Sequence, residues 1–567
     1  MRAATSRRSG VVPLTAAVLI IAAACAGSDD DSAPPSDATP ETDAPSPVDA
    51  DTPTATMPPS ATSTGDGVDS APAPDVSSAA PTTTTPEADF LPEMVEGPCG
   101  GDPFENRDGV RCGTVAVPLD HADPTGPTIE IAVAQVSPIG DQLLTTDPVL
   151  RLQGGPGGGI TDAVGGWADG DAREGFGVVL IEYRGEPNSD PALVCDEKWA
   201  ALVENLGVSD PFPAEADRIA DAVELCAERA ASDGIDVSRF DTPAIADDIE
   251  LVRQALDVGR WNLIGISYGT TTAMEVMRRH PDSVRSAILD SVYPPERSTI
   301  ADVEGGLDHL LAVFDDTCPP GSGCNPTDEA FSDRFRAITA ALDENPAVTT
   351  LTDPITGEPF DALLDGGDFA NAAWLAVWSG NVPDLVAGAV ASDDPAAWTS
   401  AMQVVLDIFV ADYGDSSLLM ADAVECRDRG GALGREAIDA AVVERPEFSG
   451  IFQYATYVGH GITCDGLGLG TIEGWTDPLV SDLPTLVVAG RWDAVTPPAW
   501  GEALLDGLPN GRFFEYPGLA HGTYAVTDCS ESISHQFLAD PTGEIDSSCI
   551  AAMTDHFDDR PEELDGS

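Results

Sequence analysis

The sequence predicts an α/β fold in which a mostly parallel sheet carries helices on both faces, with an inserted, mainly helical cap. Three observations lead to this class. Short apolar runs typical of buried strands alternate with amphipathic helical stretches between residues 148 and 291, as in parallel sheets. The strand pattern stops at residue 292 and returns only after residue 478. A Gly-x-Ser-x-Gly turn at 265–269 joins a central strand to a helix.

The core is predicted in two parts, 89–291 and 479–567, on either side of a cap at 292–478. The first part opens with a hairpin, because turn residues separate two strand-like runs at 113–119 and 128–136. Further strands are predicted at 148–152, 178–183, 263–266, 286–289, 484–489 and 512–516, and core helices at 214–231, 243–256 and 271–279. Within the cap we expect helices, at 327–342 and 369–379 among others, and no regular strand.

The N-terminus is predicted to be an export signal. Three arginines within the first eight residues precede an apolar run at 11–24 that is too short for a membrane span. The run ends in Ala22-Ala23-Ala24-Cys25, which resembles the lipobox of bacterial lipoproteins, although leucine is usual where this chain has Ala22. We expect residues 1–25 to be a signal peptide ending at a lipidated Cys25, and the protein to lie on the outer face of the cell membrane. Cleavage without lipidation, giving a secreted protein, is the alternative.

Residues 26–88 are predicted to be a disordered tether. They are mostly Asp, Ser, Pro, Thr and Ala, with no aromatic and no basic residue. Such a composition cannot bury enough apolar surface to offset the entropy lost on ordering. As a flexible coil, roughly 63 residues would span about 45 Å.

The chain is strongly acidic, with a formal net charge of −70, and Lys198 is its single lysine. This charge argues against nucleic acid as a partner, because phosphate contacts need cations. Solubility accounts for the acidity, and adaptation to saline surroundings, where salt screens the self-repulsion, is the alternative. The sequence does not determine the oligomeric state.

Eleven cysteines are present, and Cys25 is separated from the other ten by the predicted tether. In an exported protein the ten can form five disulfides. Proximity in sequence predicts the pairs Cys99–Cys112, Cys195–Cys226, Cys318–Cys324, Cys426–Cys464 and Cys529–Cys549. Metal binding is the alternative for Cys318 and Cys324, but no second ligand pair at zinc spacing accompanies them.

The turn at 265–269 presents Ser267 as a candidate nucleophile. A serine hydroxyl needs an adjacent base, which is itself oriented by a third group. Asp493 and His521 each follow one of the last two predicted strands, and the carboxyl ends of parallel strands meet at one edge of a sheet. The order Ser, Asp, His is that of the α/β hydrolases. Asp290 also ends a strand; we favour Asp493 because its strand directly precedes the one leading to His521.

A glycine-rich turn at 153–159 follows the strand at 148–152, where α/β hydrolases supply a donor for the oxyanion. The predicted donors are the backbone N–H of Tyr268 and one from Gly154 or Gly155. A phosphate-binding loop is the alternative, but the Gly-x-x-x-x-Gly-Lys-Ser/Thr pattern is absent from the sequence.

Taken together, these motifs resemble the prolyl and tripeptidyl aminopeptidases of the α/β-hydrolase superfamily, especially exported actinobacterial members with a TAP-like C-terminal region. The matching stretches are Gly154-Gly155-Pro156-Gly157, Tyr183-Arg184-Gly185, 247–256, Gly265-Ile266-Ser267-Tyr268-Gly269-Thr270, Leu289-Asp290, Gly490, Asp493, Thr496-Pro497 and His521-Gly522, together with six of the cysteines. The resemblance covers roughly residues 95–550. It implies a peptidase that releases short N-terminal pieces, with the cap selecting the substrate.

Two departures adjoin the site and bear on substrate preference. The family's usual Gly-Thr-Gly after the Arg-Gly pair is Glu186-Pro187-Asn188 here, and its frequent histidine before the double glycine is Gln153. Exopeptidases of this type hold the substrate ammonium with cap carboxylates. The sequence does not choose among the available ones, Asp302, Glu304, Asp308, Asp365 and Asp368.

We therefore expect an exported serine hydrolase that acts on peptides through an acyl-enzyme and needs no metal or organic cofactor. Ser267 would attack, His521 would transfer the proton and Asp493 would hold the imidazole tautomer. A carboxylesterase with the same three residues and a non-catalytic envelope binding protein are the alternatives.

Overall fold

The computed structural model describes residues 92–99, 108–140, 143–169, 174–208, 212–298, 303–353, 356–375, 382–392, 394–413, 416–430, 443 and 461–554. The predicted signal peptide, Cys25 and the tether lie outside the described residues. Within them, no helix combines the length and the apolar character that a membrane span requires.

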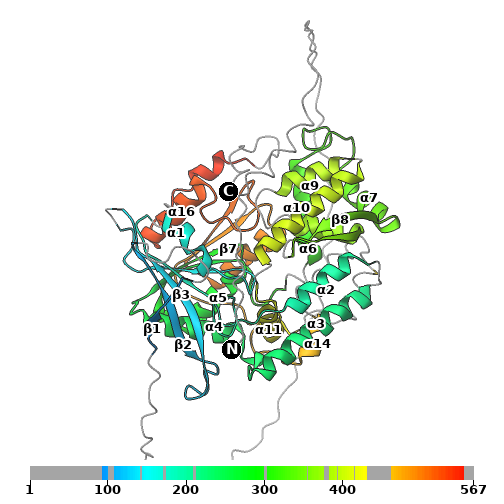
Figure 1. Ribbon diagram of the computed structural model, residues 1–567. Coiled ribbons are helices and arrows are strands. Elements are labelled where there is room, and N and C mark those ends of the chain that lie inside the picture. The colour runs from blue at the N-terminus through cyan, green and yellow to red at the C-terminus, as the bar shows by residue number, and fades with distance from the viewer. Residues whose placement is uncertain are drawn as a thin grey trace, which may run out of the picture. The chain divides into compact units, whose positions relative to one another are not determined.

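A nine-stranded sheet forms the centre of the described chain (Figure 1). Its order is β1-β2-β3-β5-β4-β6-β7-β10-β11, and every neighbouring pair from β5 to β11 is parallel, as predicted. The predicted hairpin is the antiparallel pair β2–β3. The strands are β1 (Met94–Glu96), β2 (Val110–Pro118), β3 (Thr128–Val136), β4 (Val149–Leu152), β5 (Val178–Ile181), β6 (Trp261–Ile266), β7 (Val284–Asp290), β10 (Thr485–Gly490) and β11 (Gly511–Tyr516).

Alternation along the strands divides the core into two layers. On β6, Leu263 belongs to one cluster of buried apolar side chains and Ile264 to the other, since successive residues of a strand point to opposite faces. The Leu263 cluster includes side chains from α3 (Phe212–Ser232), α4 (Thr242–Ala255), α5 (Tyr268–Arg279) and α15 (Pro498–Leu504). The Ile264 cluster includes α1 (Val164–Asp169) and α16 (Asp528–Ala539), which lie together in Figure 1.

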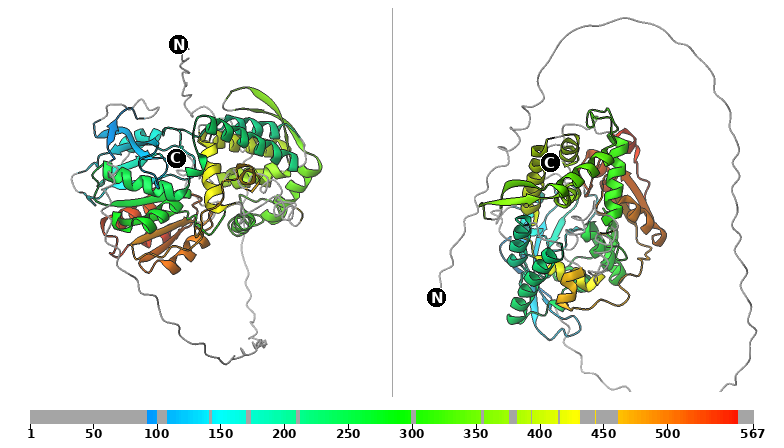
Figure 2. Two further views of the ribbon diagram at one scale, coloured as in Figure 1. Left: turned by 90° about the horizontal axis from the view of Figure 1, so that it is seen from below. Right: turned by 90° about the vertical axis from the view of Figure 1, so that its right-hand side faces the viewer.

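Between β7 and β10 the chain inserts a segment whose apolar side chains, among them Phe314, Phe335 and Trp374, form a cluster with Trp492, Ala494, Val495 and Ala520 of the core. It lies beside the sheet in the left view of Figure 2. Its first elements are α6 (Val303–Thr317), α7 (Phe331–Glu344), β8 (Ala347–Thr352), β9 (Pro359–Leu364), α8 (Gly366–Leu375), α9 (Val382–Ala391) and α10 (Pro395–Tyr413).

The expectation that this segment has no strand is wrong, because β8 and β9 form an antiparallel pair. Both strands are largely exposed, with only Leu351, Ala362 and Leu364 buried. So little burial leaves a weak alternation signal in the sequence.

The end of the inserted segment packs on the hydrolase core. Leu419, Met420, Ala423 and Val424 of α11 (Leu418–Arg429) belong to the core cluster that contains α5. The short helix α14 (Gly461–Leu467) also lies against α3 and α11. The bounds 292–478 for a cap therefore stay a prediction, and α11 contributes to the core itself.

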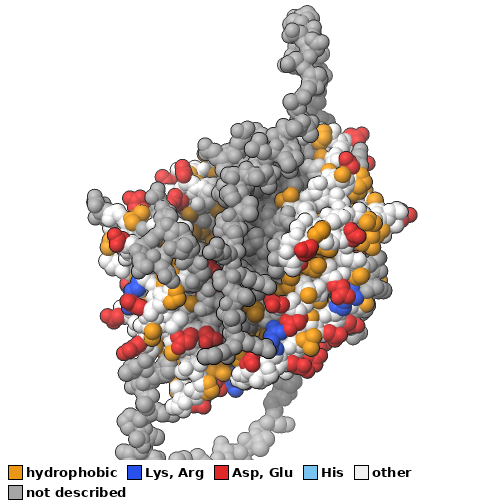
Figure 3. Space-filling view, in the orientation of Figure 1, with side chains coloured by type: hydrophobic (Ala, Val, Ile, Leu, Met, Phe, Trp, Pro, Cys, Tyr) orange, Lys and Arg blue, Asp and Glu red, His pale blue; other side chains and the backbone are white. Residues whose placement is uncertain are grey.

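All five predicted disulfides are present, with Cα–Cα distances between 5.1 and 5.8 Å, inside the range for bridged cysteines. Cys318 and Cys324 therefore pair with each other, and the metal alternative for them is wrong. On the face drawn in Figure 3, acidic side chains of the described residues clearly outnumber basic ones, in keeping with the net charge.

The single lysine is buried. Lys198, on α2 (Asp196–Leu206), is 1% exposed and its Nζ donates to both carboxylate oxygens of Asp422 on α11, at 2.7 and 3.0 Å. Removing one partner of a buried ion pair leaves an uncompensated charge, which typically costs about 3–5 kcal/mol.

We predict that Asp422→Ala lowers the free energy of unfolding by about 3–5 kcal/mol, measured by urea denaturation of the oxidised protein. Glu96→Ala, which breaks the exposed Arg111–Glu96 pair, is the control and should cost about 0–1 kcal/mol. The double variant Lys198→Met/Asp422→Leu should recover most of the loss. Equal effects of Asp422→Ala and Glu96→Ala would contradict this account.

Candidate active site

Ser267 lies on the sharp turn between β6 and α5, and its backbone is strained. Its φ of 57° and ψ of −126° are rarely adopted by a residue with a side chain. The flanking glycines are required by close packing: a Cβ at Gly265 would lie 2.3 Å from the Gly269 carbonyl oxygen, and a Cβ at Gly269 would lie 2.2 Å from that of Leu152. The turn therefore lies directly against the end of β4, and its serine is 8% exposed.

Asp493 and His521 form a hydrogen-bonded pair. Nδ1 of His521 lies 3.1 and 3.0 Å from the two carboxylate oxygens of Asp493, which is completely buried. The backbone N–H groups of Val495 and Thr496 and the Thr496 hydroxyl also donate to this carboxylate, each at 2.9 Å. Burial opposes ionisation, but His521 and the Thr496 donors outweigh it and hold the pKa of Asp493 below its ordinary value.

The same pairing acts on the histidine in the opposite sense. Burial lowers the pKa of His521, but the charge and the hydrogen bond of Asp493 outweigh burial, so the pKa lies above its ordinary value. A carboxylate against Nδ1 favours the tautomer protonated at that nitrogen, which leaves Nε2 as the basic position.

Asp290, the rival acid, has a different set of partners. Its carboxylate accepts hydrogen bonds from the Thr523 N–H (2.6 Å), the Thr523 hydroxyl (2.9 Å) and the Tyr524 N–H (2.7 Å). The neighbouring Ser291 hydroxyl accepts from the Gly522 N–H at 2.9 Å. Asp290 therefore anchors the loop that carries His521, and burial raises the pKa of its carboxyl. The structure supports the choice of Asp493 as the partner of the histidine.

The serine turn, the glycine-rich turn and the histidine loop meet at the carboxyl edge of the sheet. A Cβ at Gly154 would lie 3.1 Å from Cβ of Ser267 and 3.6 Å from its hydroxyl. A Cβ at Gly522, next to His521, would lie 3.5 Å from the side chain of Ile266. The Tyr268 side chain is buried in the core, with its hydroxyl 2.5 Å from that of Thr242, so only its backbone can serve the site.

Of the cap carboxylates considered for binding a substrate ammonium, the structure describes the side chains of Asp308, Asp365 and Asp368. Asp365 and Asp368 cap the start of α8, where each accepts the backbone N–H of the other, at 3.0 and 2.9 Å. Asp308 lies on α6. Asp302 and the side chain of Glu304 lie outside the described parts of the chain.

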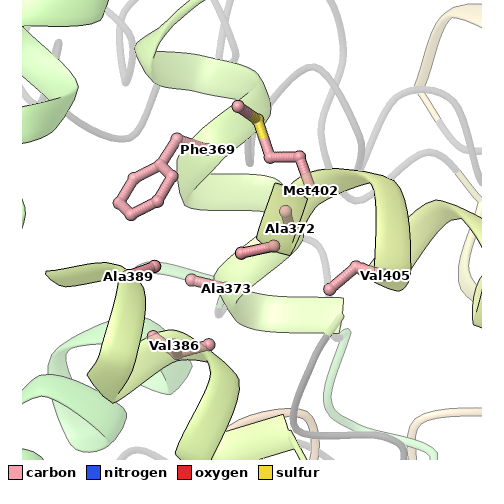
Figure 4. Close-up of a pocket in the computed structure, with 8 residues that line it drawn as sticks. Phe369, Ala372, Ala373, Val386, Ala389, Met402 and Val405 are labelled. Carbon is pink, nitrogen blue, oxygen red and sulfur yellow. The ribbon is translucent and has the colours of Figure 1, made fainter. Parts of the chain in front are cut away.

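A small pocket in the inserted segment is lined by none of the predicted site residues (Figure 4). It is formed between α8, α9 and α10 and contains no polar side chain. Its lining residues are Phe369, Ala372, Ala373, Val386, Ala389, Ala401, Met402 and Val405. Such a lining is typical of a packing gap inside an apolar cluster.

Sequence reasoning missed the residues that support the acid. Thr496 donates twice to Asp493, and its hydroxyl lies 3.3 Å from Nδ1 of His521. From the inserted segment, His309 bonds to the carbonyl oxygen of Arg491 at 2.8 Å, and the Trp374 indole donates to that of Ala494 at 3.3 Å. The Thr-Pro that follows Asp493 was a usable signal for Thr496; nothing in the sequence pointed to His309 or Trp374.

We predict that Asp493→Asn and Asp290→Asn differ sharply in the rate at which a fluorophosphonate labels Ser267. Asp493→Asn should slow labelling of Ser267 by a fluorophosphonate about 10³–10⁴-fold, because an amide stabilises the wrong imidazole tautomer. Asp290→Asn should slow it by no more than about 10-fold, since the amide oxygen can still accept from Thr523 and Tyr524. Labelling rates at fixed pH measure both, and the reverse order would make Asp290 the acid.

Comparison with known proteins agrees with this architecture. Residues 147–316 match a family described as alpha/beta hydrolase fold, and residues 454–549 match one described as TAP-like protein. The chain is 30% identical over 205 residues to a tripeptidyl aminopeptidase of Streptomyces lividans, an alignment that covers 34% of this chain and only 37% of that protein.

Two mycobacterial proteins are also similar. Carboxylesterase B of Mycobacterium tuberculosis is 29% identical over 262 residues, covering 42% of this chain and 48% of that protein. Serine protease Hip1 of the same organism is 24% identical over 452 residues, covering 73% and 82%. With the parallel sheet and the strand–Ser267–helix turn, these matches lead to one conclusion: the chain has an α/β-hydrolase fold, and its residues 454–549 are similar to the TAP-like family.

Proposed function

We propose that the protein is a serine hydrolase that releases short pieces from the N-terminus of peptides through an acyl-enzyme. The observation that carries the proposal is the meeting of the strained Ser267 turn with Gly154 and with the loop of the His521–Asp493 pair. Peptides are favoured over other acyl substrates because tripeptidyl aminopeptidase and serine protease are the names of two of the similar proteins.

In the proposed mechanism the Ser267 hydroxyl attacks the scissile carbonyl while Nε2 of His521 takes its proton. The N–H groups of Tyr268 and of Gly154 or Gly155 stabilise the negative oxygen of the tetrahedral intermediate, each contributing about 2.7–4 kcal/mol. His521 then gives the proton to the leaving amine. Water, activated by the same histidine, hydrolyses the acyl-enzyme and restores Ser267. Asp493 keeps its charge throughout and orients the ring.

The proposed place of action is outside the cell membrane. The arginine-led apolar segment and Cys25 support export and lipid anchoring, and residues 26–88 would hold the hydrolase away from the membrane surface.

We predict that the wild type hydrolyses peptide arylamides with a free N-terminus at least about 100-fold faster than the same arylamides acetylated at that position, because pairing a desolvated ammonium is worth several kcal/mol. Rates of arylamine release measure the ratio. Ser267→Ala should reduce both rates to the level of buffer, which controls for contaminating peptidases. Equal rates on the two substrates would remove the aminopeptidase assignment.

The likeness to carboxylesterase B makes an esterase the second candidate. It would be favoured if short acyl esters were turned over and free peptides were not. A binding protein without catalysis would be indicated if a fluorophosphonate failed to label the wild type.

We predict that Cys25→Ser shifts the protein from the detergent phase to the aqueous phase in detergent partitioning of cells that express the full chain, because one thioether-linked lipid is lost. Intact-mass measurement should show the corresponding loss of diacylglycerol. Substitution of the neighbouring Ala26 by Ser is the control, and unchanged partitioning of Cys25→Ser would refute lipidation.

A further inference from the structure

Two glutamates that the proposed mechanism does not use lie completely buried against the glycine-rich turn. Glu182 and Glu186 both follow β5, and each is 0% exposed. Isolated buried carboxylates are strongly unfavourable unless hydrogen bonds or a bound proton compensate the charge.

Glu182 holds the end of the turn. Its Oε1 accepts hydrogen bonds from the Ile160 N–H at 2.8 Å, the Thr161 N–H at 2.7 Å and the Thr161 hydroxyl at 2.8 Å. A Cβ at Gly159 would lie 3.3 Å from the other carboxylate oxygen, so the backbone passes directly over this side chain.

Glu186 holds the middle of the turn. Its Oε2 accepts from the Tyr183 N–H at 2.6 Å, and the backbone N–H of Gly157 also donates to its carboxylate. The carbonyl oxygen of Gly157 in turn accepts from the N–H of Ser417, just before α11, at 2.9 Å. The turn is thus held between Glu186 and the segment that leads into α11.

The two carboxyl groups face each other. Within the described residues, Oε2 of Glu182 and Oε1 of Glu186 have no donor, and the two side chains are hydrogen-bond neighbours. A single proton between them would satisfy both oxygens and remove one of two buried charges. Burial, together with the neighbouring Glu182 carboxylate, raises the pKa of Glu186 well above its usual range.

The other groups around the pair supply no cation. The Tyr183 hydroxyl donates to the Gln153 carbonyl oxygen at 3.1 Å, and burial, with the Glu186 charge, raises its pKa. Arg151 interacts with Tyr183 and donates to the Leu152 carbonyl oxygen. Asn188 donates to Oε1 of Glu182 at 3.4 Å. Arg184 forms its ion pair with Asp248. No ion pair joins an arginine or lysine of the described residues to Glu182 or Glu186.

We propose that Glu182 and Glu186 share one proton and together position the 153–159 turn, whose Gly154 lies beside Ser267. Glu186 is one of the departures from the family pattern, so this pairing of Glu182 with Glu186 is a feature of this chain. Loss of the shared proton places two negative charges side by side and loosens the hold on Gly157 and Thr161. The catalytic part of the inference rests on the proposed function; the shared proton does not.

Thermal unfolding against pH tests the shared proton without using activity. Because the folded state raises the pKa of Glu186, it binds more protons than the unfolded state above about pH 4.5, so stability falls as pH rises. Glu186→Gln keeps a donor toward Glu182 and cannot titrate. Its melting temperature relative to the wild type should therefore rise between pH 5 and pH 9, by about 1 °C for each kcal/mol in a chain of this size. The exposed Glu344→Gln carries the same charge change and should show no such trend.

Peptide arylamide hydrolysis tests the positioning. Glu186→Ala leaves the N–H groups of Tyr183 and Gly157 without their acceptor and should lower kcat roughly 10–100-fold, with KM changed less than about 2-fold. We expect kcat of the wild type to fall as pH rises and the shared proton is lost. Glu186→Gln should keep kcat at neutral pH and should not show this fall.

Parallel melting curves for the wild type and Glu186→Gln across this pH range would overturn the shared proton. A full kcat in Glu186→Ala would overturn the positioning role. If no variant hydrolyses peptides while the melting trend is seen, the proposed function fails and the shared proton stands.

Discussion

The close packing around Ser267 is the constraint on which the rest of the structure depends. β4, β6 and α5 converge so tightly that glycine is required on both sides of the serine. A non-glycine residue at positive φ costs on the order of 1–3 kcal/mol and persists only where its surroundings hold it. Here the Ser267 N–H donates to the carbonyl oxygen of Asp290 at 3.0 Å, and both the N–H and the hydroxyl of Thr270 donate to the Ser267 carbonyl oxygen, at 2.8 and 2.6 Å. Every residue from Tyr268 to Met277 is buried, so the core holds the turn in place.

The inserted segment and the acid loop depend on each other. A Cβ at Gly306 of α6 would lie 2.1 Å from the carbonyl oxygen of Ala494, so the helix lies directly on the loop that carries Asp493. Trp492 packs edge-on against Phe314 of the same helix, with ring centroids 5.1 Å apart. With the bonds from His309 and Trp374, these contacts make α6 and α8 a fixed support for the acid.

A chain with so few cations uses several of them inside the fold. Arg184 is fully buried and binds both carboxylate oxygens of Asp248, at 2.7 and 2.6 Å. Lys198 binds Asp422, and Arg429 lies over the ring of Tyr293 at 3.8 Å from its centroid. Each contact joins segments that are distant in sequence. Because a buried charge without its partner is costly, these pairs restrict which segments can pack together.

The sequence by itself determined the sheet and the serine turn, and proximity along the chain predicted the cysteine pairs. Apolar alternation and turn residues are local properties, so they predicted the β2–β3 hairpin and every central strand to within a few residues. Disulfide partners close in sequence could be matched for the same reason.

The hairpin β8–β9 was not predicted because its exposed strands show little alternation of apolar and polar residues. The helix α11 could not be assigned to the core, because the periodicity of a helix does not show which element it packs against. The sequence favoured Asp493, but only the tertiary structure shows that Asp493, and not Asp290, meets His521. Asp290 ends β7 and Asp493 closely follows β10 at the same edge of the sheet, so side-chain distances choose between them. The same holds for the facing carboxyls of Glu182 and Glu186, whose chemistry comes from burial and hydrogen-bond geometry that no local pattern encodes.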